Sequence, residues 1–169
     1  MGRFLRKDDI KDLRTRIDSA IGLGDSLLPR GCRVEGFSSK KGEVFAVDGQ
    51  PTFYVGEDGK MFPLLVSVLR SALQLPRVTV DMKAVPHICN GADVFRGGIR
   101  GIDPAIRSKQ VIIVSDEKNL KPICIGVSLV DAKTMEEMSQ GKVVINVHYV
   151  GDSIWDFSKS LENRVSQNS

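Results

Sequence analysis

The segment VTVDMKAVPHICNGADVFRGGIRG, residues 78–101, decides the fold of the second half of the chain. It opens on Val78-Thr79-Val80, whose β-branched residues favour a strand, and Asp81 is a residue type that often caps a helix. Pro86 is tolerated only in the first turn of a helix, because it has no backbone N–H to donate. The segment therefore predicts a strand and then a helix of one or two turns that begins near Ala84.

The same segment ends in glycines that allow several interpretations. Asn90-Gly91 is typical of a helix end, Val94-Phe95 returns to strand, and residues 96–101 form a glycine-rich turn. A dinucleotide site needs GxGxxG before a long helix, and neither is present. Residues 98–101 do spell the GxxG of a KH domain, but there the motif joins two helices. We interpret the turn as a tight bend at a barrel corner, where glycine allows close backbone approach.

Downstream, the pattern is mostly short strands separated by turns. A short helix capped by Asp131 is predicted to run through Met138. The predicted strands are residues 111–114, 123–129, 143–147 and 154–157. Many short strands with two small helices in about eighty residues indicate a compact, partly closed β-barrel rather than a βαβ sheet.

Upstream, the pattern is that of an α+β domain. Apolar residues recur at helical spacing over residues 7–21, and Gly22 follows as a stop signal. Strands are predicted at residues 44–47 and 53–55, and a second helix follows Pro63. We thus predict an α+β N-terminal domain of two helices with antiparallel strands over residues 1–77, the barrel over 78–158 and a frayed tail over 159–169.

Composition places the chain among ordinary globular proteins. It has 169 residues, 41% hydrophobic and 27% charged, which excludes collagen, wholesale disorder and a membrane span. Three cysteines without CxxC spacing argue against a disulfide framework and favour a reducing compartment. The first residues contain no apolar signal-peptide region, so we expect a cytoplasmic location.

Charge gives only a local argument for nucleic acid. The net charge is +3, and residues 78–169 hold equal numbers of basic and acidic side chains. Two basic clusters stand out, each equally well explained as a solvated loop. They are Arg30, Arg33, Lys40 and Lys41, and Arg96, Arg100, Arg107 and Lys109.

Residues with catalytic or metal-binding chemistry are few. His87 and Cys89 could supply two metal ligands, but no further ligand pair lies near them in the sequence. A surface histidine beside a core cysteine explains both residues better. We therefore expect no catalytic residue, no metal and no cofactor, and a protein that is not an enzyme.

Several separated motifs resemble those of the PUA domain. Residues 80–85 and 90–99 are similar to its opening, a capped short helix followed by Gly-Ala-x-Val and a Pro/Gly-Gly turn. The run ICIGVSL at residues 123–129 is similar to its returning-glycine strand, and residues 147–155 to its close. The resemblance covers about residues 79–157 and implies a mostly-β PUA pseudobarrel with short helices.

The first half of the chain is similar to the pre-PUA domain of the malignant T-cell amplified sequence (translation machinery-associated) family and its archaeal relatives. The similar motifs are Val47-Asp48-Gly49, Phe53-Tyr54, Phe62-Pro63-Leu64, Leu69 and Leu75-Pro76. This resemblance implies binding of structured RNA and, in eukaryotic members, action with density-regulated protein on the small ribosomal subunit. Two departures are Gly97-Gly98 in place of Pro-Gly and Pro86 in the first helix.

The PUA resemblance also implies an RNA-binding groove beside the first helix, the Gly-Ala turn and the second strand. There a ring could stack on a splayed base, and Arg96 could pair with phosphate. Phe95 and Tyr149 could equally pack in the core, and Trp155 is better explained as core. The implied RNA-binding residues are His87, Asn90, Gly91, Ala92, Asp93, Phe95, Arg96, Gly97, Gly98, His148 and Tyr149.

The leading hypothesis is a non-enzymatic RNA-binding protein with a role in translation, whose PUA domain holds an RNA such as the acceptor end of tRNA. Its implied partners are tRNA or rRNA and, through residues 1–77, the small ribosomal subunit or a protein. Two alternatives remain open: an accessory RNA-binding subunit of an RNA-modifying enzyme, and a protein–protein adaptor with a degenerate barrel. A continuous positive groove past Arg96 and Gly91 would favour RNA, and scattered charges would favour the adaptor.

Overall fold

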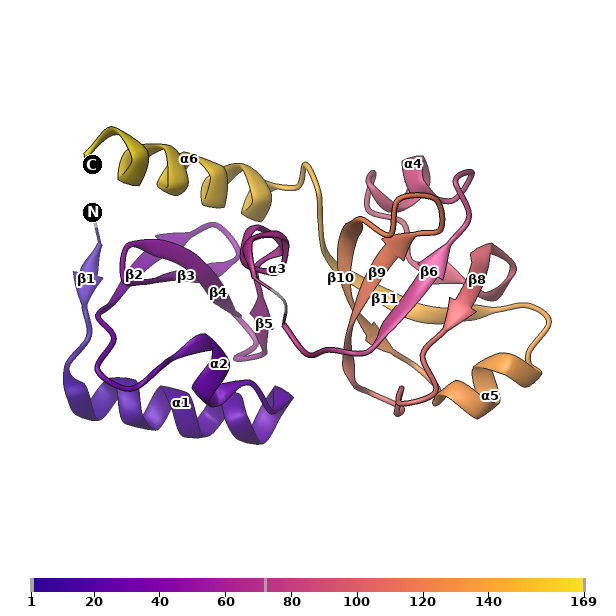
Figure 1. The fold of residues 1–169 in the computed structure, drawn as a ribbon, viewed down its shortest axis with the longest axis horizontal. Helices are drawn as coiled ribbons and strands as arrows, with labels where there is room; N and C mark the ends of the chain where they lie inside the picture. The colour runs from indigo at the N-terminus through magenta and orange to yellow at the C-terminus, as the bar shows by residue number, and fades with distance from the viewer. Residues whose placement is uncertain (1, 72, 169) are drawn as a thin grey trace. The chain divides into compact units, whose positions relative to one another are not determined.

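The chain folds into two compact units (Figure 1). The first unit is Met1–Leu73 together with Asp156–Ser169, and the second unit is Gln74–Trp155. The computed structural model describes residues 2–71 and 73–168, so Met1, Ala72 and Ser169, which fall in the predicted first domain, second helix and tail, lie outside the described residues. No described helix is long and apolar enough to cross a membrane.

The first unit is built on a five-stranded antiparallel sheet with three helices from the first half of the chain. Its strands follow the order β1 (Arg3–Phe4), β2 (Val34–Ser39), β3 (Gly42–Val47), β4 (Gln50–Gly56) and β5 (Met61–Pro63). The helices are α1 (Lys7–Ile21), α2 (Gly24–Leu27) and α3 (Leu65–Arg70). As the spacing predicts, α1 buries Ile10, Leu13 and Ile17. Phe45 and Phe53 stack across the sheet, with ring centroids 4.9 Å apart.

The second unit is a mixed six-stranded sheet that curls into a pseudobarrel, as predicted. Among the described strands of this unit, β6 and β9 pair in parallel and the other neighbouring strands are antiparallel. The strand order is β7 (Val94–Phe95), β11 (Lys142–Tyr149), β10 (Pro122–Ser128), β9 (Val111–Asp116), β6 (Arg77–Val80) and β8 (Ile99–Ile102). The short helices are α4 (Val85–Ile88) and α5 (Ala132–Glu137), with a 3₁₀ turn at Arg96–Gly98. Residues 99–101, predicted as turn, are therefore the start of β8.

The C-terminal segment is where the sequence prediction is wrong. Residues 154–157, expected as a strand, and the tail expected to be frayed from residue 159 form one helix, α6 (Ser153–Gln167). Ile154, Ser158 and Leu161 are buried at helical spacing, a period that a short apolar run conceals. Asp152 caps the helix by accepting a hydrogen bond from the Trp155 N–H at 2.7 Å. Residues 156–169 belong to the first unit rather than to a separate tail.

Candidate nucleic-acid interface

The predicted site is built around α4 and the turn that follows it. The Asp81 carboxylate accepts a hydrogen bond from the Ala84 N–H at 2.8 Å, and Pro86 lies in the first turn as expected. Ile88 anchors the helix in the core, with 2% of its surface exposed. Gly91 then adopts a left-handed conformation, with φ of +97°, which favours glycine. Its N–H donates to the Ile88 carbonyl, so this amide closes the helix rather than facing a ligand.

Strand β11 holds the Gly-Ala turn in place through one side chain that the sequence analysis missed. The Asn146 amide donates to the carbonyl oxygens of Ile88 and Ala92, at 3.0 Å each. In return, the Asp93 carboxylate accepts from the Asn146 backbone N–H at 2.8 Å. An asparagine within an apolar strand was the available signal, because such a residue must find partners when it is partly buried. The turn is thus fixed before any ligand arrives.

Phe95 is the most exposed aromatic side chain of this site. It has 54% of its surface exposed, which contradicts the alternative that it packs in the core. Strand pairing places Lys142 opposite it, with the amine nitrogen 6.0 Å from the centroid of the Phe95 ring. The same nitrogen lies 2.9 Å from a carboxylate oxygen of Asp93. Lys142 therefore belongs to the site, although the sequence analysis did not nominate it.

We define the α4 face as the half-buried or exposed side chains that surround this turn. Tyr149 is half-buried, and a Cβ placed on Gly91 would lie 3.4 Å from its hydroxyl oxygen, so the tyrosine ring borders the turn. The α4 face comprises His87, Asn90, Gly91, Ala92, Asp93, Phe95, Lys142 and Tyr149. Seven of these eight residues were predicted from the sequence. The eight residues come from α4, the turn after it, β7 and β11.

Arg96 occupies a different position from the one expected. Its guanidinium donates to the carbonyl oxygens of Met135 at 2.6 Å and Ile99 at 3.3 Å, so it ties α5 to the turn before β8. The side chain is half-buried in this role. Arg96 is therefore a structural residue of the barrel corner, and replacing it would remove both of these hydrogen bonds.

The Gly97-Gly98 turn is held by Arg100. The Arg100 guanidinium donates to the Gly97 carbonyl at 3.0 Å and pairs with the Asp81 carboxylate at 2.8 Å. The Asp81 N–H also donates to the Gly98 carbonyl. A Cβ on Gly97 would meet no atom within 4 Å, so this residue lies open to solvent. The turn lies close to the start of α4, because a Cβ placed on Gly98 would be 3.3 Å from the Ala84 Cβ.

His148 cannot contact RNA in this structure, which corrects its nomination. It is fully buried, and its Nδ1 lies 2.9 Å from a carboxylate oxygen of Asp152. Burial raises the pKa of the Asp152 carboxyl, but hydrogen bonds from His148 and from the N–H groups of Trp155 and Tyr149 outweigh it, so the net pKa is lowered. The pair therefore joins the end of β11 to the start of α6.

The charges of the α4 face and those that hold the Gly97-Gly98 turn are paired rather than continuous. Lys142 pairs with Asp93, and Arg100 pairs with Asp81. Partial burial raises the pKa of the Asp93 carboxyl. Interactions with the Asn146 N–H and the Lys142 amine lower this pKa by more than burial raises it, so Asp93 is ionised at neutral pH. Among the described residues, no group of three or more His, Cys, Asp or Glu side chains could hold a metal ion. The face offers a ring, amides and compensated charges.

Comparison with known proteins agrees with this architecture. The PUA domain family matches residues 76–150. The uncharacterized protein MJ1432 of Methanocaldococcus jannaschii is 36% identical over 154 residues, 91% of this chain and 94% of its own. Translation machinery-associated protein 20 of Schizosaccharomyces pombe is 26% identical over 174 residues, 90% of this chain and 96% of its own.

A solved structure extends the agreement to the whole fold. The hypothetical protein PH0734.1 of Pyrococcus horikoshii superimposes with a TM-score of 0.79 and 32% identity, covering 94% of this chain and 99% of that one. Both units of the chain therefore have a counterpart in an archaeal protein. The chain belongs with MJ1432 to one family of PUA-domain proteins, and it is similar to the malignant T-cell-amplified sequence and translation machinery-associated proteins.

Proposed function

We propose that this protein is a non-enzymatic, cytoplasmic RNA-binding protein that acts in translation and holds RNA on the α4 face. Two kinds of observation support the proposal. The name of the Schizosaccharomyces pombe relative connects the family with the translation machinery. The PUA resemblance implies an RNA-binding groove at the position where the α4 face lies.

The observation that carries the proposal is the exposed ring of Phe95 beside Lys142. Phe95 lies at the end of β7, and an aromatic ring left in water forgoes the free energy of burial, so covering this ring with a ligand would be favourable. A nucleobase stacked on such a ring contributes about 1–3 kcal/mol. Lys142 lies where a phosphate next to that base could approach it. The paired charges make stacking the larger contribution and bulk electrostatics the smaller one.

A single-stranded RNA end fits this face better than a regular duplex does. Stacking on a protein ring needs an unstacked base, and such bases occur in loops, bulges and ends. The acceptor end of tRNA provides one, which supports the finer proposal. Contact with the small ribosomal subunit or a protein partner through residues 1–77 rests on the family resemblance alone.

The experiment measures fluorescence anisotropy of labelled tRNA, intact and with its single-stranded 3′ end trimmed. Phe95→Leu keeps an apolar side chain and removes the ring, so we expect binding of intact tRNA to weaken by about fivefold or more. Leu69→Ala on α3 is the control, because Leu69 is a similarly exposed apolar residue, 42% exposed, in the first unit. We avoid Arg96→Ala, since its loss would disturb the barrel corner.

Two results would contradict the proposal. One is the absence of binding to either RNA at low salt, which would favour the adaptor alternative that the paired charges leave open. The other is an equal loss of RNA affinity in Phe95→Leu and Leu69→Ala, which would show that RNA does not bind at the α4 face. Loss of affinity on trimming alone would support end recognition.

A further inference from the structure

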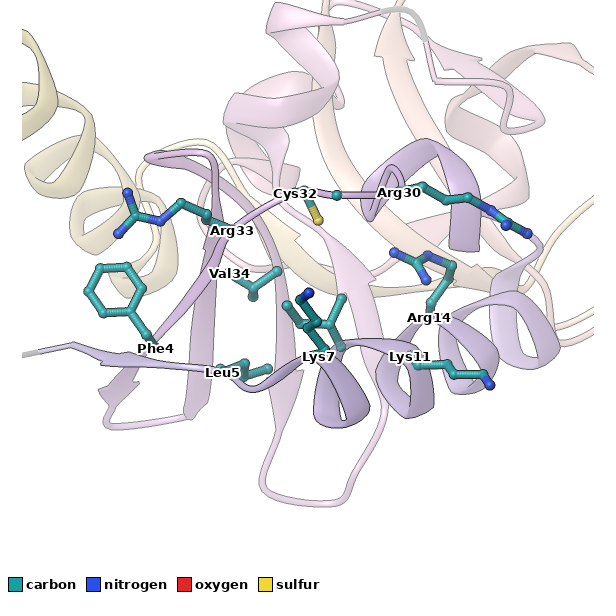
Figure 2. Close-up of a pocket in the computed structure, with 11 residues that line it drawn as sticks. Phe4, Leu5, Lys7, Lys11, Arg14, Arg30, Cys32, Arg33 and Val34 are labelled. Carbon is teal, nitrogen blue, oxygen red and sulfur yellow. The ribbon is translucent and has the colours of Figure 1, made fainter.

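A concave site lies in the first unit, and it shares no residue with the α4 face. It is a pocket of about 820 Å³ between the first half of α1 and the loop that leads into β2. Figure 2 shows Lys7 and Arg14 rising from the helix toward that loop, with the Cys32 side chain pointing back between them. Buried Ile10 and Val34 add apolar surface to its wall. We call it the α1 pocket.

The α1 pocket is strongly basic. None of its lining residues is acidic, and five are cationic. None of the five forms an ion pair within the part of the chain that the structure describes. They are Lys7, Lys11, Arg14, Arg30 and Arg33.

Three of these cations lie on one face of α1. Lys7, Lys11 and Arg14 recur at intervals of four and three residues, which places them on one face of α1, where like charges repel. Arg14 is fixed there, because its guanidinium donates to the carbonyl oxygens of Leu28 at 2.6 Å and Pro29 at 3.3 Å. A bound anion would relieve this repulsion. The row therefore favours an anionic ligand.

Two further features of the α1 pocket limit the chemical class of its ligand. Burial raises the pKa of the Cys32 thiol, with the Asp48 carboxylate acting in the same direction, so the thiol is uncharged at neutral pH and does not repel an anion. Phe4 borders the pocket with 61% of its surface exposed, and the Arg33 guanidinium lies 4.9 Å from its ring centroid. A multiply charged group and a flat ring in one ligand describe a nucleotide better than a carboxylate peptide.

We propose that the α1 pocket binds the phosphate group of a nucleotide, with Lys7 and Arg30 as its cationic contacts, Arg14 as a fixed positive charge in its wall and Phe4 beside the base. The phosphate chemistry is shared by a free nucleotide and by the 5′-phosphate end of an RNA. The pocket is independent of RNA binding by the α4 face. Cationic groups in contact with phosphate each strengthen binding through charge-assisted hydrogen bonds.

The test uses the full chain and a fluorescent nucleoside triphosphate. The double variant Lys7→Gln/Arg30→Gln removes two exposed pocket charges, and we expect about tenfold weaker binding or more. The matched control, Lys40→Gln/Lys41→Gln, removes two exposed charges between β2 and β3, outside the pocket, and should bind as the unaltered protein does. Phe95→Leu should also leave nucleotide binding unchanged, so failure of the two proposals can be told apart.

Competition separates the two sources of phosphate. An RNA oligomer that displaces the nucleotide only when it carries a 5′-phosphate would identify an RNA end, and displacement by unlabelled nucleotide alone would identify a free nucleotide. Either outcome supports the proposal. It is overturned if no nucleotide binds, if both double variants lose affinity equally, or if only a poly-glutamate peptide binds, which would make the pocket a docking site for an acidic protein.

Discussion

Close packing in the barrel depends on single residues, and Gly126 in β10 leaves very little space for a larger side chain. A Cβ at this position would lie 2.4 Å from a Val144 methyl carbon and 2.9 Å from the Ile145 carbonyl oxygen, and the latter is backbone that cannot move away cheaply. We expect Gly126→Ala to lower the free energy of unfolding by about 1–3 kcal/mol. Gly97→Ala, which meets no atom within 4 Å, should change it by less than about 0.5 kcal/mol. Urea unfolding of both variants compares the two, and equal effects would contradict this packing account.

Asp152 makes stability depend on pH at the acidic end. Its folded-state pKa lies below the ordinary value of 3.8, so its carboxylate contributes stability that is fully present above that value and is lost as the pH falls through the folded pKa. We expect Asp152→Asn to lower stability at pH 7 by about 1–3 kcal/mol and to flatten the acid side of the pH profile. Asp156→Asn, at an exposed position on α6, is the control. A wild-type-like acid profile for Asp152→Asn would refute the assignment.

Asp93 limits the charge that the α4 face can offer to RNA. Because its carboxylate pairs with Lys142 at 2.9 Å, the amine is neutralised before a phosphate reaches it. We expect Asp93→Asn to keep the acceptor for the Asn146 N–H, to tighten RNA binding, and to steepen the dependence of log affinity on log salt by about one. The measurement is an anisotropy titration across a salt series, with Glu136→Gln on α5 as control. Weaker binding would show that Asp93 itself contacts RNA.

At the scale of elements, α6 is a structural part of the first unit. Leu161 is buried at 5% exposure, and Glu162 lies 3.8 Å from Arg70 of α3. Leu161→Ala should therefore destabilise the protein by about 2 kcal/mol or more. Asn163→Ala, at an exposed position of the same helix, should have little effect. Urea unfolding monitored by circular dichroism compares them, and a neutral Leu161→Ala would support the frayed tail that the sequence suggested.

The elements also show what sequence reasoning can reach. Residues 7–21 gave a correct helix because their burial is one-sided and follows a strict period. Residues 154–157 were predicted as a strand because the pattern of four residues is the same for a strand and for the first turn of a helix. The residues against which α6 packs also lie about a hundred positions earlier in the chain, so the local sequence does not reveal them. Within the site, Asn146 and Lys142 were missed since their importance arises from strand pairing.

At the scale of the whole molecule, two units present two different surfaces. The α4 face of the second unit has one exposed ring and paired charges, whereas the α1 pocket of the first unit has five cations and no acidic residue in its lining. The net charge of +3 is a sum over the whole chain, so it does not describe the charge of either surface. Binding that relies on stacking should depend weakly on salt, and binding that relies on unpaired cations should depend on it strongly.

The most direct measurement is an NMR titration of the ¹⁵N-labelled protein with a minihelix that carries the tRNA acceptor stem and its single-stranded 3′ end. The account predicts that the largest amide shifts fall on residues 87–98 and on Lys142 and Tyr149, and that they shrink when the 3′ end is trimmed. Shifts confined to the α1 pocket, or no shifts at low salt, would contradict RNA binding by the α4 face.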